Sequence, residues 1–338
     1  MSSRRTSLPA AMKVAGFVFT LASLGFAAYL VARHGGDLAA RWDELRAAGW
    51  RLRAGWLAGA LAVATTNLFL LGGAWVLLVR ALGGEIGYLE GMRAWTWTNL
   101  GRYLPGRVWQ ISALTLYLRE KKRIGGIGLG SSLLLQVQML AVGGAIAFAV
   151  FGLRLAEGRL ALIAGACGFT LAGLAAALRP SIVGGLTRRV SGWMGEPWQG
   201  ADPAPRALWT SAAVVTTSWF VYGVGLFLLW RGLGADGGPD AWFWTGAFAA
   251  AYLVGYVALF APAGLIVREA SLTAFLVGFG GVAAAPAAGV AIASRLWAIA
   301  SELCAAGLSW ILPGRAGAGT GGAGAAREDT EMNEIDTP

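Results

Sequence analysis

The chain has 338 residues, of which 57% are hydrophobic and only 13% are charged, and its formal net charge is +9. Soluble domains carry about 25% charged residues, so this composition excludes an ordinary soluble domain and predicts an integral membrane protein. The basic residues lie in short segments between apolar runs. Membrane orientation and anionic lipid head groups therefore explain the charge better than nucleic acid does.

The apolar runs predict an all-α, polytopic helical bundle with about seven or eight membrane spans, including two segments that are broken or re-entrant. A basic cytoplasmic segment, 1–13, precedes the transmembrane domain, 14–312, and the tail 313–338 is expected to be disordered. Spans are predicted near 14–32, 54–79, 88–118 (broken), 127–152, 160–178, 208–230, 241–261, 262–281 (broken) and 287–312.

The distribution of Lys and Arg predicts a cytoplasmic N-terminus in a multi-pass protein of the cytoplasmic membrane. The segments 1–13, 80–123 and 179–206 carry more basic residues than the loops assigned to the opposite face. With this orientation, both broken segments open from the cytoplasmic face.

Two features are expected to lie at the membrane interface. The segment Asp37–Arg53 mixes acidic, basic and apolar residues in the manner of a short amphipathic surface helix. Several tryptophans near the predicted span ends are expected to act as interfacial anchors. They are Trp42, Trp50, Trp56, Trp95, Trp97, Trp242 and Trp244.

The first broken segment contains Arg102 and Arg107 on either side of Pro105 and Gly106. In a bilayer every backbone N–H and C=O must find a partner, so a helix breaks at depth only where protein or a wet cavity covers it. Arg is well suited to bidentate contact with phosphate, and a broken helix adds free N–H groups. A head-group site is one interpretation; interfacial snorkelling of the arginines is the other.

The second broken segment contains Pro262 and Gly264, followed by Arg268 and Glu269. Charges at this depth are costly and are functional hypotheses by default, although a structural ion pair of Glu269 with Arg107 or Arg295 is an equal alternative. Paired interrupted segments in the two halves of a membrane protein point to a transport site.

Two more ionisable residues lie in the last predicted span. Arg295 and Glu302 are seven residues apart, which is two helical turns, so both are expected to face the bundle interior. Gln136 and Gln138 could line the same interior, but hydrogen bonding between helices explains them equally well.

No catalytic, metal or cofactor site is predicted. With His34 as the single histidine and only two cysteines, neither a catalytic triad nor a His/Cys metal centre can form. The run Gly125–Gly130 is similar to a nucleotide-binding loop, but it opens a membrane span and is better explained by close helix packing.

The two broken segments resemble elements of the lysylphosphatidylglycerol synthase transmembrane region, a flippase-like family. Leu104-Pro105-Gly106-Arg107 matches an early element, Pro262-x-Gly264-x-x-x-Arg268-Glu269 matches a late one, and Arg295 matches an Arg in the final span. The resemblance implies a polytopic membrane protein that moves lipids. The cytosolic aminoacyl-transferase domain is not expected, and Gln136 or Gln138 stands where an acidic residue is often found.

The residues and the resemblance together predict a transporter that moves a phospholipid or lipid-linked head group across the cytoplasmic membrane. Arg107 and Arg268 would hold the phosphate, and Glu269 would pair with an Arg or a cationic group. The main alternative is a membrane accessory protein that binds a lipid-linked precursor for a glycosyltransferase or lipid-modifying enzyme without moving it. A membrane-embedded transferase is a third reading, which lacks visible catalytic residues. The expected partners are an anionic or lipid-linked substrate and membrane lipids.

Overall fold

The computed structural model describes residues 25, 28–29, 32–33, 35–37, 39–40, 42–47, 49–103, 109–155, 160–196, 202–257 and 267–312. Every regular element within these residues is a helix, so the predicted all-α class is confirmed. Most of the first predicted span, 14–32, lies outside them, as do the tail and the stretches 104–108 and 258–266 at the two predicted breaks.

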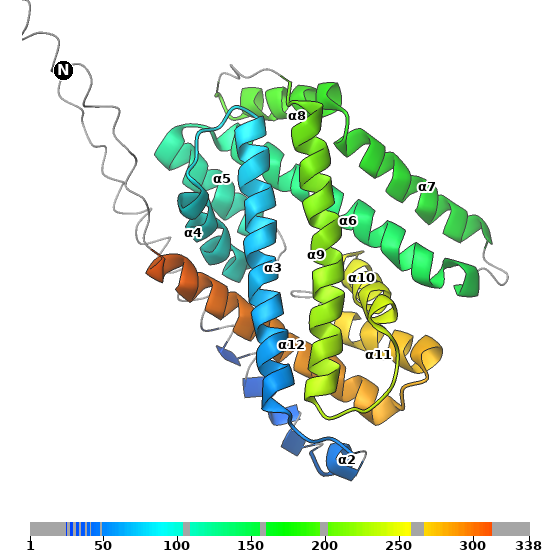
Figure 1. Cartoon of the computed structure of the whole chain (residues 1–338). Coiled ribbons are helices and arrows are strands. Elements are labelled where there is room, and N and C mark those ends of the chain that lie inside the picture. The colour runs from blue at the N-terminus through cyan, green and yellow to red at the C-terminus, as the bar shows by residue number, and fades with distance from the viewer. Residues whose placement is uncertain are drawn as a thin grey trace, which may run out of the picture.

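Two long helices, α3 (Ala54–Ala81) and α9 (Pro205–Gly232), form an antiparallel pair through the bundle (Figure 1). Each has 28 residues, a length of about 42 Å at 1.5 Å per residue. The start of α3 lies beside the end of α9, where the backbone N–H of Arg53 donates to the Gly232 carbonyl at 2.8 Å. The two ends of α3 therefore mark the two ends of the bundle.

The chain after α3 forms a first hairpin from α4 (Tyr88–Asn99), η1 (Leu100–Tyr103) and α5 (Trp109–Lys122). Glu90 holds its open end together: its carboxylate lies 3.6 Å from Lys122 Nζ and accepts a hydrogen bond from the Tyr117 hydroxyl at 3.3 Å. Gly84, just after α3, packs against Ile124, just after α5. The open end therefore lies at the Ala81 end of α3, where α6 (Gly125–Leu155) begins.

A second hairpin is formed by α10 (Ala241–Val257) and α11 (Val267–Gly280). Gly280 at the end of α11 packs against Phe243 near the start of α10, and Gly255 near the end of α10 packs against Arg268 in α11. The open end lies beside the loop that follows α9, at the Arg53 end of α3. From there the chain continues into α12 (Ala284–Ile311).

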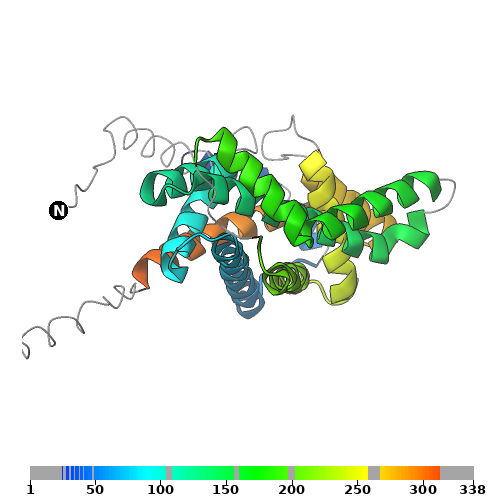
Figure 2. The same cartoon turned by 90° about the horizontal axis from the view of Figure 1, so that it is seen from above.

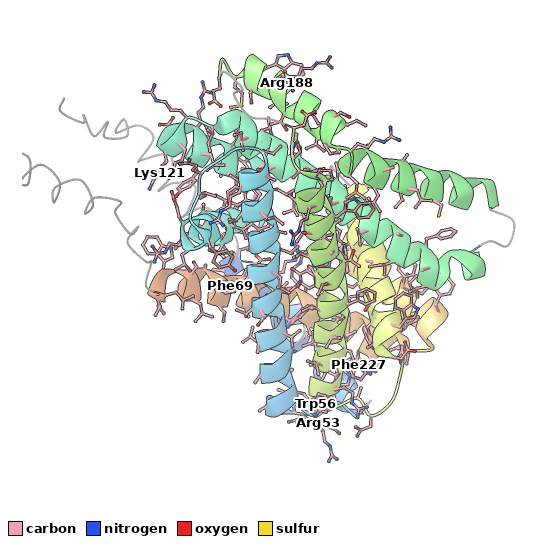
Figure 3. The ribbon with its side chains drawn as sticks, turned by 45° about the horizontal axis from the view of Figure 1, so that its top comes forward. Arg53, Trp56, Phe69, Lys121, Arg188 and Phe227 are labelled. Atoms are coloured by element: carbon pink, nitrogen blue, oxygen red, sulfur yellow. The ribbon has the colours of Figure 1, made fainter. Side chains whose placement is uncertain are left out.

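The two hairpins thus enter the bundle from opposite ends. Figure 3 shows Lys121 of the first hairpin and Arg53 at opposite ends of the molecule. The order helix, hairpin, helix occurs twice, as α3–α4–α5–α6 and as α9–α10–α11–α12, with opposite directions. This differs from our expectation that both breaks open from one face. That expectation treated 241–261 as a full span, whereas α10 has only 17 residues and packs antiparallel to α11.

Between the two halves, α7 (Leu160–Ala177) and α8 (Pro180–Trp193) connect α6 to α9, and the chain bends by 79° between them. Viewed along α3 and α9, α6 and α7 extend to one side (Figure 2). Gly126 and Gly130 of α6 lie directly against Ser191 and Thr187 of α8, where a side chain would not fit. The prediction that these glycines serve helix packing is confirmed.

Membrane-spanning capacity can be judged from length and composition. Among the described residues, four helices are long and apolar enough to cross a membrane, namely α3, α6, α9 and α12, and the bent pair of α7 and α8 raises the number to five. A polytopic membrane protein is therefore supported, whereas the predicted number of seven or eight spans stays a prediction.

The segment before α3 packs into the bundle rather than lying only on a membrane surface. It contains the short helix α2 (Trp42–Ala47), and Leu45 and Trp50 are 1% and 3% exposed. Both side chains lie against Gly289 of α12. The apolar side chains therefore cover the first turns of α12, whereas Asp43, Glu44 and Arg46 are exposed. The predicted short amphipathic helix is present, and its place at a membrane surface stays a prediction.

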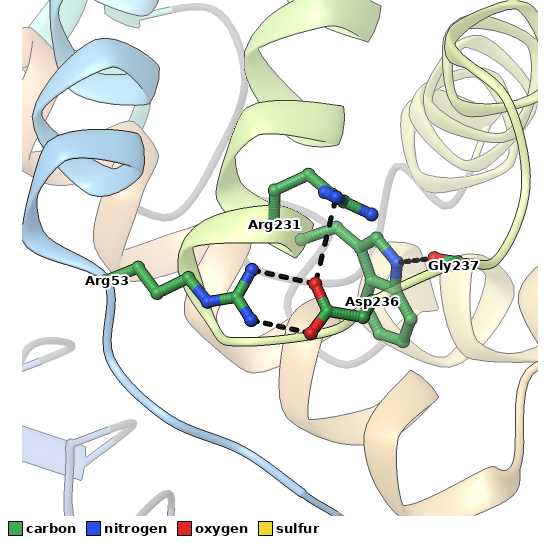
Figure 4. Close-up of polar contacts among 5 residues, drawn as sticks. Arg53, Arg231, Asp236 and Gly237 are labelled. Atoms are coloured by element: carbon green, nitrogen blue, oxygen red, sulfur yellow. Dashed lines mark hydrogen bonds and ion pairs between the residues drawn. The ribbon is translucent and has the colours of Figure 1, made fainter.

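A charge cluster ties α3 to the loop after α9 (Figure 4). Arg53 donates two hydrogen bonds to the Asp236 carboxylate, at 2.8 and 2.6 Å, and Arg231 lies 3.7 Å from the same group. The hydrogen bonds from Arg53 hold the pKa of Asp236 below its usual value. The indole N–H of Trp230 donates to the Gly237 carbonyl at 2.9 Å and closes the same loop.

Candidate functional site

A cavity of about 150 Å³ lies in the middle of the bundle, between the two hairpins. Side chains from all eight helices of the two halves line it: α3, α4, α5 and α6 from the first, and α9, α10, α11 and α12 from the second. Asn99 and Gln110 come from the inner end of the first hairpin, and Gly255 and Arg268 from the inner end of the second. The broken segments therefore meet at one site.

Five predicted site residues lie outside the described residues: Pro105, Gly106, Arg107, Pro262 and Gly264. Arg102 falls in η1, where the helix of the first hairpin tightens before the break. The four predicted residues with described side chains are Arg268, Glu269, Arg295 and Glu302, and all of them are buried. Three of these, all but Glu269, line the cavity.

Glu269 and Arg295 form a buried ion pair between α11 and α12. A guanidinium nitrogen, Nη2, lies 2.9 Å from a carboxylate oxygen, and the side chains are 10% and 6% exposed. This pairing was one of the two alternatives that the sequence left open for Glu269. Removing one partner of such a pair leaves a desolvated charge, so the contact fixes α11 against α12 and orients Arg295.

Arg268, the neighbour of Glu269 on α11, contacts both α12 and α10. Its Nη2 donates to Ser294 Oγ on α12 at 3.0 Å, and its guanidinium carbon lies 5.2 Å from the centre of the Phe248 ring on α10. A guanidinium over an aromatic face is a favourable cation–π arrangement. The neighbouring residues Arg268 and Glu269 on α11 thus both contact α12, and Arg268 also lines the cavity.

Arg295 and Glu302 both face the interior, as their seven-residue spacing predicts. They are 5% and 2% exposed, and both line the cavity. Ionisable groups within membrane segments are rare and mark pathways or relays rather than lipid-facing surface. The cavity therefore presents charged groups of both signs at the centre of an apolar bundle.

The structure separates the two glutamines of α6. Gln138 is fully buried and is satisfied by α9: its amide oxygen accepts from Ser211 Oγ at 2.5 Å and its amide nitrogen donates to the Leu208 carbonyl at 3.4 Å. Gln136 lines the cavity instead. Residues two positions apart on a helix point in directions about 200° apart. The sequence alone could not show which of the two glutamines faces the cavity.

Aromatic side chains form a large part of the cavity wall, and sequence reasoning did not assign them to it. The rings of Trp219 on α9 and Tyr252 on α10 meet edge to face, with their centroids 5.4 Å apart. The ring centroids of Tyr252 and Tyr256 are 6.2 Å apart. Trp95, which was expected at the membrane interface, is 9% exposed and lines the cavity from α4. A Trp near a span end is an interfacial signal only when its helix actually reaches the interface.

Metal chemistry finds no support in the described residues, where no group of three His, Cys, Asp or Glu side chains could hold an ion.

Comparison of the chain with models of known protein families gives a match. Residues 14–318 match the family described as the lysylphosphatidylglycerol synthase TM region. The chain belongs to this family. The match covers both halves of the bundle and the cavity between them, and it gives the protein a membrane lipid-related role. The family region is the non-catalytic part of the synthase. A search of curated proteins gives no match.

Proposed function

We propose that this protein is a flippase-like transporter that carries a phospholipid or lipid-linked head group across the cytoplasmic membrane, and that it is not an enzyme. The observation that carries the proposal is the meeting of two oppositely directed hairpins at one cavity with buried charges. A head group crossing a bilayer needs a polar path through apolar surroundings. Arg268, Arg295 and Glu302 supply polar groups at the bundle centre.

The inverted order of the two halves supports transport rather than binding alone. Inverted repeats with broken helices at the midplane allow a fixed site to open to one side and then to the other. Here one hairpin enters from each end, and both reach the same cavity. An accessory protein that only presented a lipid to an enzyme on one face would need access from that face alone.

The test is reconstitution into liposomes with a fluorescent phospholipid and a membrane-impermeant quencher. Wild-type protein is expected to make inner-leaflet lipid accessible to the quencher much faster than empty liposomes do. Wild-type liposomes that match empty ones would overturn the proposal and leave the accessory reading in its place.

The role of Arg268 is tested with Arg268→Met, with Arg188→Met as the matched control. Arg188 lies on α8, outside the cavity lining, and its side chain is 60% exposed. Arg188→Met therefore removes the same charge at a site away from the cavity. Arg268→Met is expected to slow translocation about tenfold or more, since it removes a charge-assisted contact. Equal rates in two well-folded variants would reject Arg268 as a contact residue but not the transport itself.

A further inference from the structure

Three buried N–H groups, all on residues that line the cavity, have no acceptor within the described part of the chain. They are the indole Nε1 of Trp95 on α4, the amide Nε2 of Gln136 on α6 and the guanidinium Nε of Arg295 on α12. Trp95 and Arg295 are 9% and 5% exposed as whole residues. In folded proteins nearly all buried polar groups find a partner, so three unmatched groups around one cavity require an explanation.

All three groups are hydrogen-bond donors, which identifies the chemistry of the missing partner. An indole nitrogen and a guanidinium can donate but cannot accept. A ligand that satisfies all three groups therefore offers several acceptor atoms. Arg295 carries a positive charge, and its ion pair with Glu269 uses Nη2, whereas Nε has no acceptor among the described residues. An oxyanion meets these requirements.

We propose that Trp95, Gln136 and Arg295 form an oxyanion subsite that binds the phosphate of a phosphodiester head group. This inference deepens the transport proposal and rests on it for the lipid. A cavity of about 150 Å³ has room for such a group, since a water molecule occupies about 30 Å³ of liquid.

Binding is measured by native mass spectrometry of the detergent-solubilised full chain, without any transport step. The probes are a short-chain phosphatidylglycerol, a diacylglycerol with the same acyl chains, and inorganic phosphate as competitor. Phosphatidylglycerol is expected to bind at least tenfold more tightly than diacylglycerol. Equal affinity for the two would overturn the subsite. Competition by inorganic phosphate at millimolar concentration would identify a site open to free phosphate, and its absence a site specific for the lipid head group.

Trp95→Phe removes the indole N–H and keeps an aromatic ring, and Trp97→Phe is its matched control. Trp97 lies on the same helix with an indole N–H that also has no acceptor among the described residues, but it packs against Trp310 and does not line the cavity. Trp95→Phe is expected to weaken phosphatidylglycerol binding about tenfold, the usual effect of one hydrogen bond to a charged group. Trp97→Phe should leave it unchanged, and equal affinities of the two variants would contradict the proposal.

Gln136→Glu is the second variant, because it places a negative charge beside the proposed phosphate. It should weaken phosphatidylglycerol binding by well over tenfold and leave diacylglycerol binding unchanged. Unchanged phosphatidylglycerol binding in the folded variant would also overturn the subsite. The two proposals fail separately: wild-type protein that binds as described but does not translocate lipid refutes transport alone. Translocation without phosphate-dependent binding refutes the subsite alone.

Discussion

The buried pair of Glu269 and Arg295 allows the sharpest test of how the interior is held together. Glu269→Gln keeps the size of the side chain and removes its charge, which leaves Arg295 desolvated beside a neutral amide. Nη2 and the carboxylate oxygen are 2.9 Å apart, so the charge centres are separated by about 4 Å, and an effective dielectric constant near 20 gives about 4 kcal/mol. Breaking a buried pair by removing one partner costs about 3–5 kcal/mol, which agrees with this figure.

The assay is reversible unfolding in mixed detergent micelles, with wild type, Glu269→Gln, Arg295→Met and the double variant. Each single variant is expected to lose about 3–5 kcal/mol of unfolding free energy. The double variant should lose less than the sum, because neither charge is then left alone. The pair does not hold α11 to α12 if the losses of unfolding free energy in the two single variants add up in the double variant. The same conclusion follows if Glu269→Gln loses less than about 0.5 kcal/mol, the range of ordinary surface substitutions.

Two further predictions concern packing and the loop after α9. Gly223→Ala should destabilise the protein by about 1–3 kcal/mol, because the new methyl group would overlap Thr245 of α10. Gly307→Ala, with open space around it, should be neutral or slightly stabilising in thermal melts; equal melting shifts of the two variants would contradict this reasoning. The pKa of Asp236 is lowered by its hydrogen bonds from Arg53, so the stability that it contributes relative to Asp236→Asn is complete above its unfolded pKa of about 3.9. That contribution should fall as the pH drops through the lower folded pKa, and a constant difference between the two melting curves from pH 6 to pH 3 would refute it.

The sequence predicted the fold class and most of the helical segments because the apolar runs are long and the breaks contain proline and glycine. It also predicted correctly that Arg295 and Glu302 both face the interior, because helical periodicity places residues seven apart on one face regardless of the surrounding topology. The family assignment depended on the same two broken segments, and it is confirmed by the match over residues 14–318.

The direction of the second hairpin could not be derived in the same way. A run of 17 apolar residues followed by a break, as in α10, is compatible with a short span and with a re-entrant arm. Only the contacts of Gly255 with Arg268 and of Gly280 with Phe243 show that the chain returns. Helix α8 likewise lies in the segment 179–206, which was predicted only as a basic cytoplasmic segment, although one face of the helix packs on α6.

The sequence analysis placed Trp95 at the membrane interface and left the position of Gln136 open for a related reason. Both have common structural explanations, interfacial anchoring for the one and hydrogen bonding between helices for the other. Their place in the cavity wall depends on where the first hairpin ends and on the rotation of α6, which are properties of the packed bundle.

The most direct test of the account is the sidedness of the two hairpin bases. Single cysteines are introduced by Lys121→Cys, at the open end of the first hairpin, and by Ala283→Cys, just after the second. The background carries Cys167→Ser and Cys304→Ala. A membrane-impermeant maleimide added to intact spheroplasts should label Ala283→Cys and leave Lys121→Cys unlabelled until the membrane is permeabilised. Labelling of both cysteines from the same side would contradict the inverted arrangement and, with it, the shared cavity between opposing hairpins.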